Sequence, residues 1–120
     1  MSPEARKTMA RQAILRRWIR ARFGASSFQA LGLPGGEIVD AGLTALAAGE
    51  ETIESLLVSQ AAPRLRREGV PLPGNSFPDS DVRLYRLLER QGGGLAHARY
   101  LAWLRRIASF ADACSAARVT

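Results

Sequence analysis

Apolar residues recur at helical spacing along most of the chain, and the clearest pattern lies near its C-terminal end. Two apolar-periodic segments, about 81–91 and about 95–117, flank three consecutive glycines at 92–94. Asp79, Ser80 and Asp81 offer capping side chains before the first segment. Its expected buried side is Val82, Leu84, Tyr85, Leu87 and Leu88; that of the longer segment is Tyr100, Trp103, Leu104, Ile107, Phe110 and Ala111. The pattern predicts a helical hairpin, around which the rest of the chain packs.

The N-terminal segment has the second long helical pattern. Residues 3–22 begin with Pro3, which suits a first-turn position, and Gly24 is a plausible C-terminal stop. An apolar stripe consists of Ala10, Ala13, Ile14, Trp18 and Ala21, and it is widened by Leu15 and Ile19. Arginines gather on the side of the helix opposite Leu15 and Trp18: Arg16, Arg17 and Arg20. The segment is therefore expected to be a basic, amphipathic helix.

Shorter helices are expected in the middle of the chain. Residues 37–48 form one, Gly49 ends it, and a third helix runs from Glu50 to about Ala62. Pro63 lacks the N–H that a helix interior requires, so we expect a kink there, or a break followed by one turn over 64–68. Ser26 or Ser27 is expected to cap a short turn within the connection at 24–36.

Composition agrees with an all-α fold. Alanine, leucine and arginine are abundant and favour helices, whereas β-branched and aromatic residues are few. A chain of 120 residues is one domain by length. We therefore predict a single helical domain over residues 1–120, a compact bundle of about five helices with a Pro/Gly-rich connection at about 69–80. That connection either packs through Val70, Leu72 and Phe77 or is mobile.

Charge is strongly segregated along the chain. Sixteen of the 17 basic residues are arginine, and the net charge is +6. Residues 1–24 contain seven cations and one acid, whereas residues 25–62 contain five acids and no cation. The basic helix could pack beside the acidic segment in the same molecule, at ~0–1 kcal/mol for each exposed pair. The hairpin arginines have no such complement in adjacent sequence.

Residues that carry catalytic or metal chemistry are sparse. His97 is the sole histidine and is expected to be a partly buried, hydrogen-bonded side chain. Cys114 follows it by 17 residues, or ~25 Å along a helix, too far for a nucleophile–base pair. We predict no catalytic, metal or cofactor site. An enzyme centred on His97 is the exception, and it would require that residue in a concave pocket close to a carboxylate.

Glycine-rich and acidic segments give no recognised binding motif. The glycines at 35–36 and 92–94 follow no predicted strand and lack the spacing of phosphate-binding loops. The helix–Gly49–helix outline resembles a helix-turn-helix, but its second helix begins with acids that DNA phosphates would repel. Glu50, Glu51 and Glu54 also lack the alternating acid pattern of a calcium loop. The same acids therefore argue against specific DNA recognition and against a calcium site.

Targeting and redox signals are also lacking. No run of ~18 apolar residues is present, so no transmembrane segment is expected. A single cysteine cannot form an intrachain disulfide. Cytoplasmic localisation is the default expectation.

The leading hypothesis is a non-enzymatic interaction module that binds an acidic partner protein through arginine-rich helical faces. The candidate residues are Arg83, Arg86, Arg90, Arg99, Arg105 and Arg106 on the hairpin, and Arg16, Arg17 and Arg20 on the first helix. The alternative is sequence-nonspecific nucleic-acid binding through the same arginines. A basic amphipathic helix could equally lie on an anionic membrane, and self-association is left open. Of the two basic faces, the hairpin is the favoured site, because the first helix has acids nearby in sequence.

Overall fold

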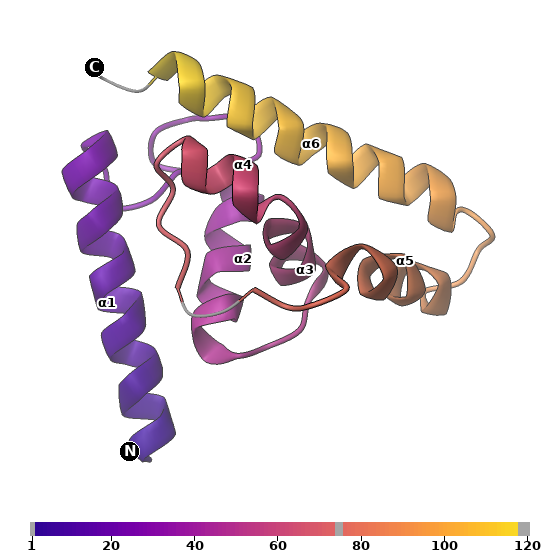
Figure 1. Ribbon diagram of the computed structural model, residues 1–120, viewed down its shortest axis with the longest axis horizontal. Coiled ribbons are helices and arrows are strands. Elements are labelled where there is room, and N and C mark those ends of the chain that lie inside the picture. The colour runs from indigo at the N-terminus through magenta and orange to yellow at the C-terminus, as the bar shows by residue number, and fades with distance from the viewer. Residues whose placement is uncertain (1, 74–75, 118–120) are drawn as a thin grey trace.

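The computed structural model describes residues 2–73 and 76–117, and every regular element within them is a helix (Figure 1). The helices are α1 (Pro3–Phe23), α2 (Gly36–Ala48), α3 (Ile53–Gln60), α4 (Ala62–Arg67), α5 (Ser80–Arg90) and α6 (Ala96–Ala117). The all-α prediction is confirmed. The described chain has six helices rather than about five because Pro63 lies in the first turn of a separate helix, α4. At that position its missing N–H leaves no helical hydrogen bond unmade.

Helices α2 and α3 form the centre of the fold and pack more extensively on each other than any other pair. Gly42 permits this approach, since a Cβ there would lie 2.5 Å from Cγ2 of Val58 and 2.6 Å from the carbonyl oxygen of Glu54. Helix α3 begins at Ile53 rather than at Glu50 because Thr52 is its N-cap. Thr52 and Ser55 form a reciprocal capping box, with N···O distances of 2.7 and 3.0 Å.

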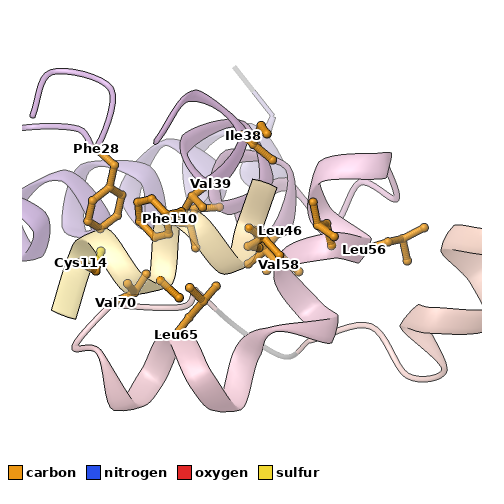
Figure 2. Packing of buried hydrophobic residues seen from close by; sticks show 14 of the residues in the cluster. Phe28, Ile38, Val39, Leu46, Leu56, Val58, Leu65, Val70, Phe110 and Cys114 are labelled. Carbon is orange, nitrogen blue, oxygen red and sulfur yellow. The ribbon is translucent and has the colours of Figure 1, made fainter. Parts of the chain in front are cut away.

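The hairpin packs against this centre and completes the core (Figure 2). Helix α6 contributes Ile107, Phe110 and Cys114, and the ring of Phe110 meets that of Phe28 edge to face at 5.1 Å. Helix α5 contributes residues that contact both α3 and α6, so the predicted hairpin is present. Its fully buried positions are Leu84 and Leu88.

The predicted inner side of α5 is wrong at its first position. Val82 is exposed and Tyr85 is only half-buried, because α5 presents its Leu84–Leu88 edge to α3. The predicted caps are wrong in part as well. Asp79 occupies the N-cap in the left-handed region, with φ of 51°, and its side chain makes no capping hydrogen bond.

Asp40 holds the connection between α1 and α2. Its two carboxylate oxygens each accept a backbone N–H at 2.9 Å, one from Phe28 and one from Gln29. Ser27 caps the short turn that follows, accepting the N–H of Ala30 at 3.1 Å, as one of the two predicted caps. This fixes the buried ring of Phe28 against the core.

The Pro/Gly-rich connection packs against the core where the structure describes it. Val70 is buried, and Leu72 and Phe77 pack against the core cluster. The N–H of Phe77 donates to Oγ of the buried Ser59 at 3.1 Å. The sequence left open whether the connection at 69–80 packs or is mobile, and its described residues pack against the core. Residues 74 and 75 lie outside the described residues.

Helix α1 lies along one edge of the molecule, packed chiefly on α2 (Figure 1). Ser2 is its N-cap, accepting the N–H of Ala5 at 3.1 Å, and Gly24 ends it in the left-handed conformation. Its buried residues are Leu15 and Ile19. In Figure 1 the connection that contains residues 70–73 runs between α1 and α2, and residues 71–73 face Ile14 and Trp18 of α1 across a hollow.

Candidate interaction surface

Helix α1 carries two separate apolar edges rather than the one broad stripe that the sequence indicated. Leu15 and Ile19 are 7% and 2% exposed and face the core, whereas Ile14 and Trp18 are 52% and 50% exposed. Each exposed residue precedes a buried one by a single position, which is about 100° around a helix. Ala10, Ala13 and Ala21, from the same predicted stripe, are exposed too. The periodicity was right, but only the margin of the stripe is buried.

Trp18 lies where three surface hollows meet. The first, of about 330 Å³, lies between α1 and the connection and is lined by Arg11, Ile14, Leu15, Trp18, Pro71, Leu72 and Pro73. A broader, shallow one of about 630 Å³ lies along α1 and is lined by Ile14, Arg17, Trp18, Arg20, Ala21 and Arg22. The third, of about 180 Å³, is lined by Trp18, Arg22, Arg66, Gly69, Val70 and Pro71. We call the residues that line these three hollows the Trp18 surface.

The Trp18 surface is basic around an apolar centre. Five arginines line it, and no acidic residue does so among the described residues. The guanidinium of Arg22 lies over the Trp18 ring at 5.4 Å. Arg11 donates to the carbonyl oxygen of Ala47 at 3.3 Å, and Arg66 donates to Oγ of Ser76 at 3.5 Å. None of these contacts neutralises the positive charge.

The predicted arginines of the first helix divide between two positions. Arg17 and Arg20 belong to the Trp18 surface, whereas Arg16 is exposed elsewhere on α1 and lines none of the three hollows. Sequence reasoning did not connect Arg11, Arg22 and Arg66 with this site. The one sequence signal for this site was Leu72, an apolar residue between two prolines. Because a residue that precedes proline favours an extended conformation, Leu72 is expected in an extended segment.

Helix α1 packs beside the acidic segment, on α2, but among the described residues its arginines form no ion pair with the acids between residues 25 and 62. Where α1 faces the acidic side of α2 and α3, it contributes Thr8 and Gln12 rather than arginines. Among the described residues, the ion pair of α1 is internal, between Lys7 and Glu4 at 3.9 Å. The arginines of α1 lie on its other sides, because the helix rotates to bury Leu15 and Ile19.

The hairpin arginines take up part of that acidic charge instead. Arg106 pairs with Glu37 at 3.1 Å, and Arg83 pairs with Glu51 at 3.2 Å. Arg106 also lies over the ring of Trp103 at 5.1 Å. The expectation that the hairpin arginines lack a complement is therefore wrong for these two, because the chain folds the acids of α2 and the α2–α3 turn against the hairpin.

The remaining hairpin arginines are exposed. Arg99 shares a hollow of about 350 Å³ with Arg106, lined also by Ile53 and Trp103. Arg86, Arg90 and Arg105 form no ion pair with any residue that the structure describes. The six candidates are thus dispersed, with part of their charge neutralised, and do not surround one apolar centre.

Arg64 ties α4 to α6. It donates to Glu68 at 3.1 Å and to Asp112 at 3.0 Å. The hydrogen bond that Arg64 donates to Asp112, followed by the one that it donates to Glu68, holds the pKa of the Arg64 guanidinium above its ordinary value. The cation is therefore part of the scaffold rather than of the Trp18 surface.

The residues considered for catalysis do not come together in a catalytic arrangement. His97 is exposed, with its ring centroid 6.3 Å from that of Tyr85, and within the described chain it has no hydrogen bond to a carboxylate. The expectation of a partly buried, hydrogen-bonded histidine is wrong. Cys114 is buried in the core near the other end of α6. No cluster of three histidine, cysteine or acidic side chains suited to a metal occurs in the part of the chain that the structure describes.

No protein-family model, curated protein or solved structure matches the chain. Within the described residues, no helix has an apolar stretch long enough to cross a membrane.

Proposed function

We propose that this protein is a non-enzymatic interaction module that binds an acidic partner protein through its arginine-bearing helical faces, with α1 as the principal one. The observation that carries the proposal is the Trp18 surface. Half-exposed Trp18 and Ile14 are surrounded there by arginines with no acidic neighbour among the described lining residues. Apolar residues with a basic rim are typical of a protein-binding surface.

The energetics favour a partner that offers both charge and apolar surface. Burying the exposed halves of Trp18 and Ile14 would contribute about 1 kcal/mol each. Arginine is also enriched among residues that dominate binding energy, because its planar guanidinium binds carboxylates bidentately. The phosphates of a nucleic acid would pair with the arginines, but the backbone would offer Ile14 no apolar contact.

The test is charge reversal on α1 with a matched reversal on the hairpin. The first variant carries Arg16→Glu, Arg17→Glu and Arg20→Glu, and the control carries Arg86→Glu, Arg90→Glu and Arg105→Glu. Both replace three exposed arginines that pair with no described acid, so both should keep the wild-type helical circular dichroism.

Tagged versions of the 120-residue chain are used to isolate partners from the source organism's extract, and each partner is then titrated in purified form. We expect an acidic protein that binds the wild type and the hairpin variant and is lost from the α1 variant. Equal binding by all three proteins contradicts the proposal for α1. Unfolding of the α1 variant alone would instead support a role for its arginines within the fold.

Nucleic-acid binding is tested separately with a short DNA duplex at two salt concentrations. Binding that depends on phosphates falls with a logarithmic slope of about −0.9 for each phosphate neutralised. Tight, steeply salt-dependent DNA binding, together with no acidic protein partner, would replace the proposal by its alternative.

A further inference from the structure

The hollow between α1 and residues 71–73 is an apolar groove. Leu15 forms its floor, Ile14 and Trp18 form the α1 wall, and the opposite wall is the Pro71–Pro73 segment. Both prolines have a restricted φ, and the buried Val70 anchors the segment at one end. A wall anchored in this way loses little conformational entropy on binding.

The groove is the size of a site for a single large side chain. Its volume of about 330 Å³ is at the lower end of the range of ligand pockets, roughly 300–1,000 Å³. Its lining is aliphatic and aromatic apart from Arg11 at the rim. It therefore suits one aliphatic or aromatic anchor rather than a polar group.

The apolar edge of α1 extends the groove along the helix axis. Ala10, Ile14, Trp18 and Ala21 are spaced by four, four and three residues, over about 17 Å. That spacing is the one by which two helices pack ridges into grooves. The second hollow, over Ile14, Trp18 and Ala21, lies next to the first with Trp18 between them. A partner helix could place apolar side chains one or two turns apart on the two sides of Trp18.

The charge around the groove selects the occupant. Five arginines line the Trp18 surface, so a segment with acids beside its apolar residues would be complementary to it. A second copy of this chain would bring the same arginines against themselves if α1 packed on α1. We infer that the Trp18 surface binds an acidic amphipathic helix of the partner protein, which inserts a large apolar side chain between α1 and residues 71–73. This inference rests on the proposed function and adds to it the conformation and chemistry of the bound segment.

The experiment uses the full chain with Trp103→Phe, so that Trp18 is the remaining tryptophan and its fluorescence reports on the surface. The probe is a synthetic peptide of about four helical turns, with leucines at i, i+4 and i+7 and glutamates beside them. The control peptide has the same composition with the leucine positions shuffled. We expect the ordered peptide to bind at least roughly tenfold more tightly and to shift the Trp18 emission. Equal binding of the two peptides overturns the inference.

Two substitutions then locate the contact. Ile14→Glu places a carboxylate in the groove, and its matched control is Leu101→Glu, at an α6 position that is 40% exposed and outside the Trp18 surface. Ile14→Glu should weaken the ordered peptide at least roughly tenfold and Leu101→Glu should leave it unchanged. Leu72→Ala, which keeps α1 intact, should give a smaller loss in the same direction. Equal effects of Ile14→Glu and Leu101→Glu overturn the inference.

Reversal of Arg17 and Arg20 separates this inference from the proposed function. If that reversal abolishes peptide binding while Ile14→Glu has no effect, acidic docking through arginine stands and the groove inference fails. If neither change affects binding, both fail. Phosphatidylcholine–phosphatidylserine vesicles are the last probe. Binding to them that requires Ile14, with no peptide binding, overturns the inference in favour of a membrane surface.

Discussion

Helices α1 and α6 are nearly equal in length, at 21 and 22 residues, and both carry several arginines beside apolar positions. In α6 the large apolar residues near its C-terminal half, Ile107 and Phe110, are buried. In α1 the largest apolar residue, Trp18, is half exposed. The buried residues of α1 are the smaller side chains of Leu15 and Ile19. Two similar patterns thus have opposite outcomes. A helical pattern indicates which residues can be buried together, and the neighbouring elements decide which of them are.

The same comparison holds for charge. Arg106 of α6 meets Glu37, and Asp112 of the same helix meets Arg64. The α1 arginines of the Trp18 surface form no ion pair with a described acid, although the acids are closer in sequence to α1 than to α6. Exposed ion pairs are weak, so they do not orient a helix against its apolar packing. Burial of Leu15 and Ile19 sets the rotation of α1 about its axis, and this rotation determines which sides of the helix its arginines occupy.

The largest expected effect is on core packing. Phe110→Ala should lower the free energy of unfolding by about 3–5 kcal/mol, because it removes a fully buried ring and leaves a cavity. Trp18→Ala should lower it by about 1 kcal/mol or less, since half of that side chain is already in water. Urea denaturation followed by circular dichroism measures both. Comparable losses would show that the Trp18 side chain is part of the core after all.

The next effect concerns the α2–α3 contact, on which the hairpin rests. Gly42→Ala should be destabilising by about 1–3 kcal/mol, because its Cβ would meet Cγ2 of Val58 and the carbonyl oxygen of Glu54. Ala41→Gly, at the adjacent exposed position, measures helix propensity alone and should cost about 1 kcal/mol. A gain in stability from Gly42→Ala, as propensity alone predicts, would contradict the close approach.

A smaller effect is expected where α1 is joined to the rest of the fold. Asp40→Ala leaves the N–H groups of Phe28 and Gln29 without their acceptor, and we expect a loss of about 2 kcal/mol in the free energy of unfolding. Asp40→Asn keeps one oxygen and should lose about half as much. Glu50→Ala is the control, an exposed acid with an expected change within about 0.5 kcal/mol. If Asp40→Ala matches Glu50→Ala in denaturant unfolding, the carboxylate does not hold the connection.

The smallest expected effect distinguishes the charges of the two helices. Glu37→Gln removes the exposed pair with Arg106 and should cost about 0.5 kcal/mol or less, with the difference shrinking as salt is added. Arg20→Gln should change the free energy of unfolding by roughly zero at any salt concentration, since no described acid pairs with it. Thermal unfolding at low and high ionic strength measures both. A larger, salt-sensitive loss for Arg20→Gln would show that α1 is neutralised within the fold.

Much of the local structure could be predicted from the residues. Gly24, Gly49 and the glycines at 92–94 lie at helix ends as expected. Pro63 lies in the first turn of a new helix, where its missing N–H breaks no helical hydrogen bond. Helix starts were less predictable, because Thr52 rather than Glu50 provides the cap of α3. Among the candidate site residues, Arg17 and Arg20 lie together on one surface, but Arg66 and the wall at 71–73 come from a distant part of the chain.

The sequence by itself determined the helical class, the basic character of α1 and the two-sidedness of α6, since these depend on residue propensity and on spacing along one helix. The tertiary structure alone decided which apolar edge of α1 is buried and which arginines meet an acid. The physical reason is that apolar burial is not directional, so either edge of α1 could have served. The shape of α2 and the path of the chain at 70–73 selected Leu15 and Ile19, and they left Trp18 in a groove on the surface.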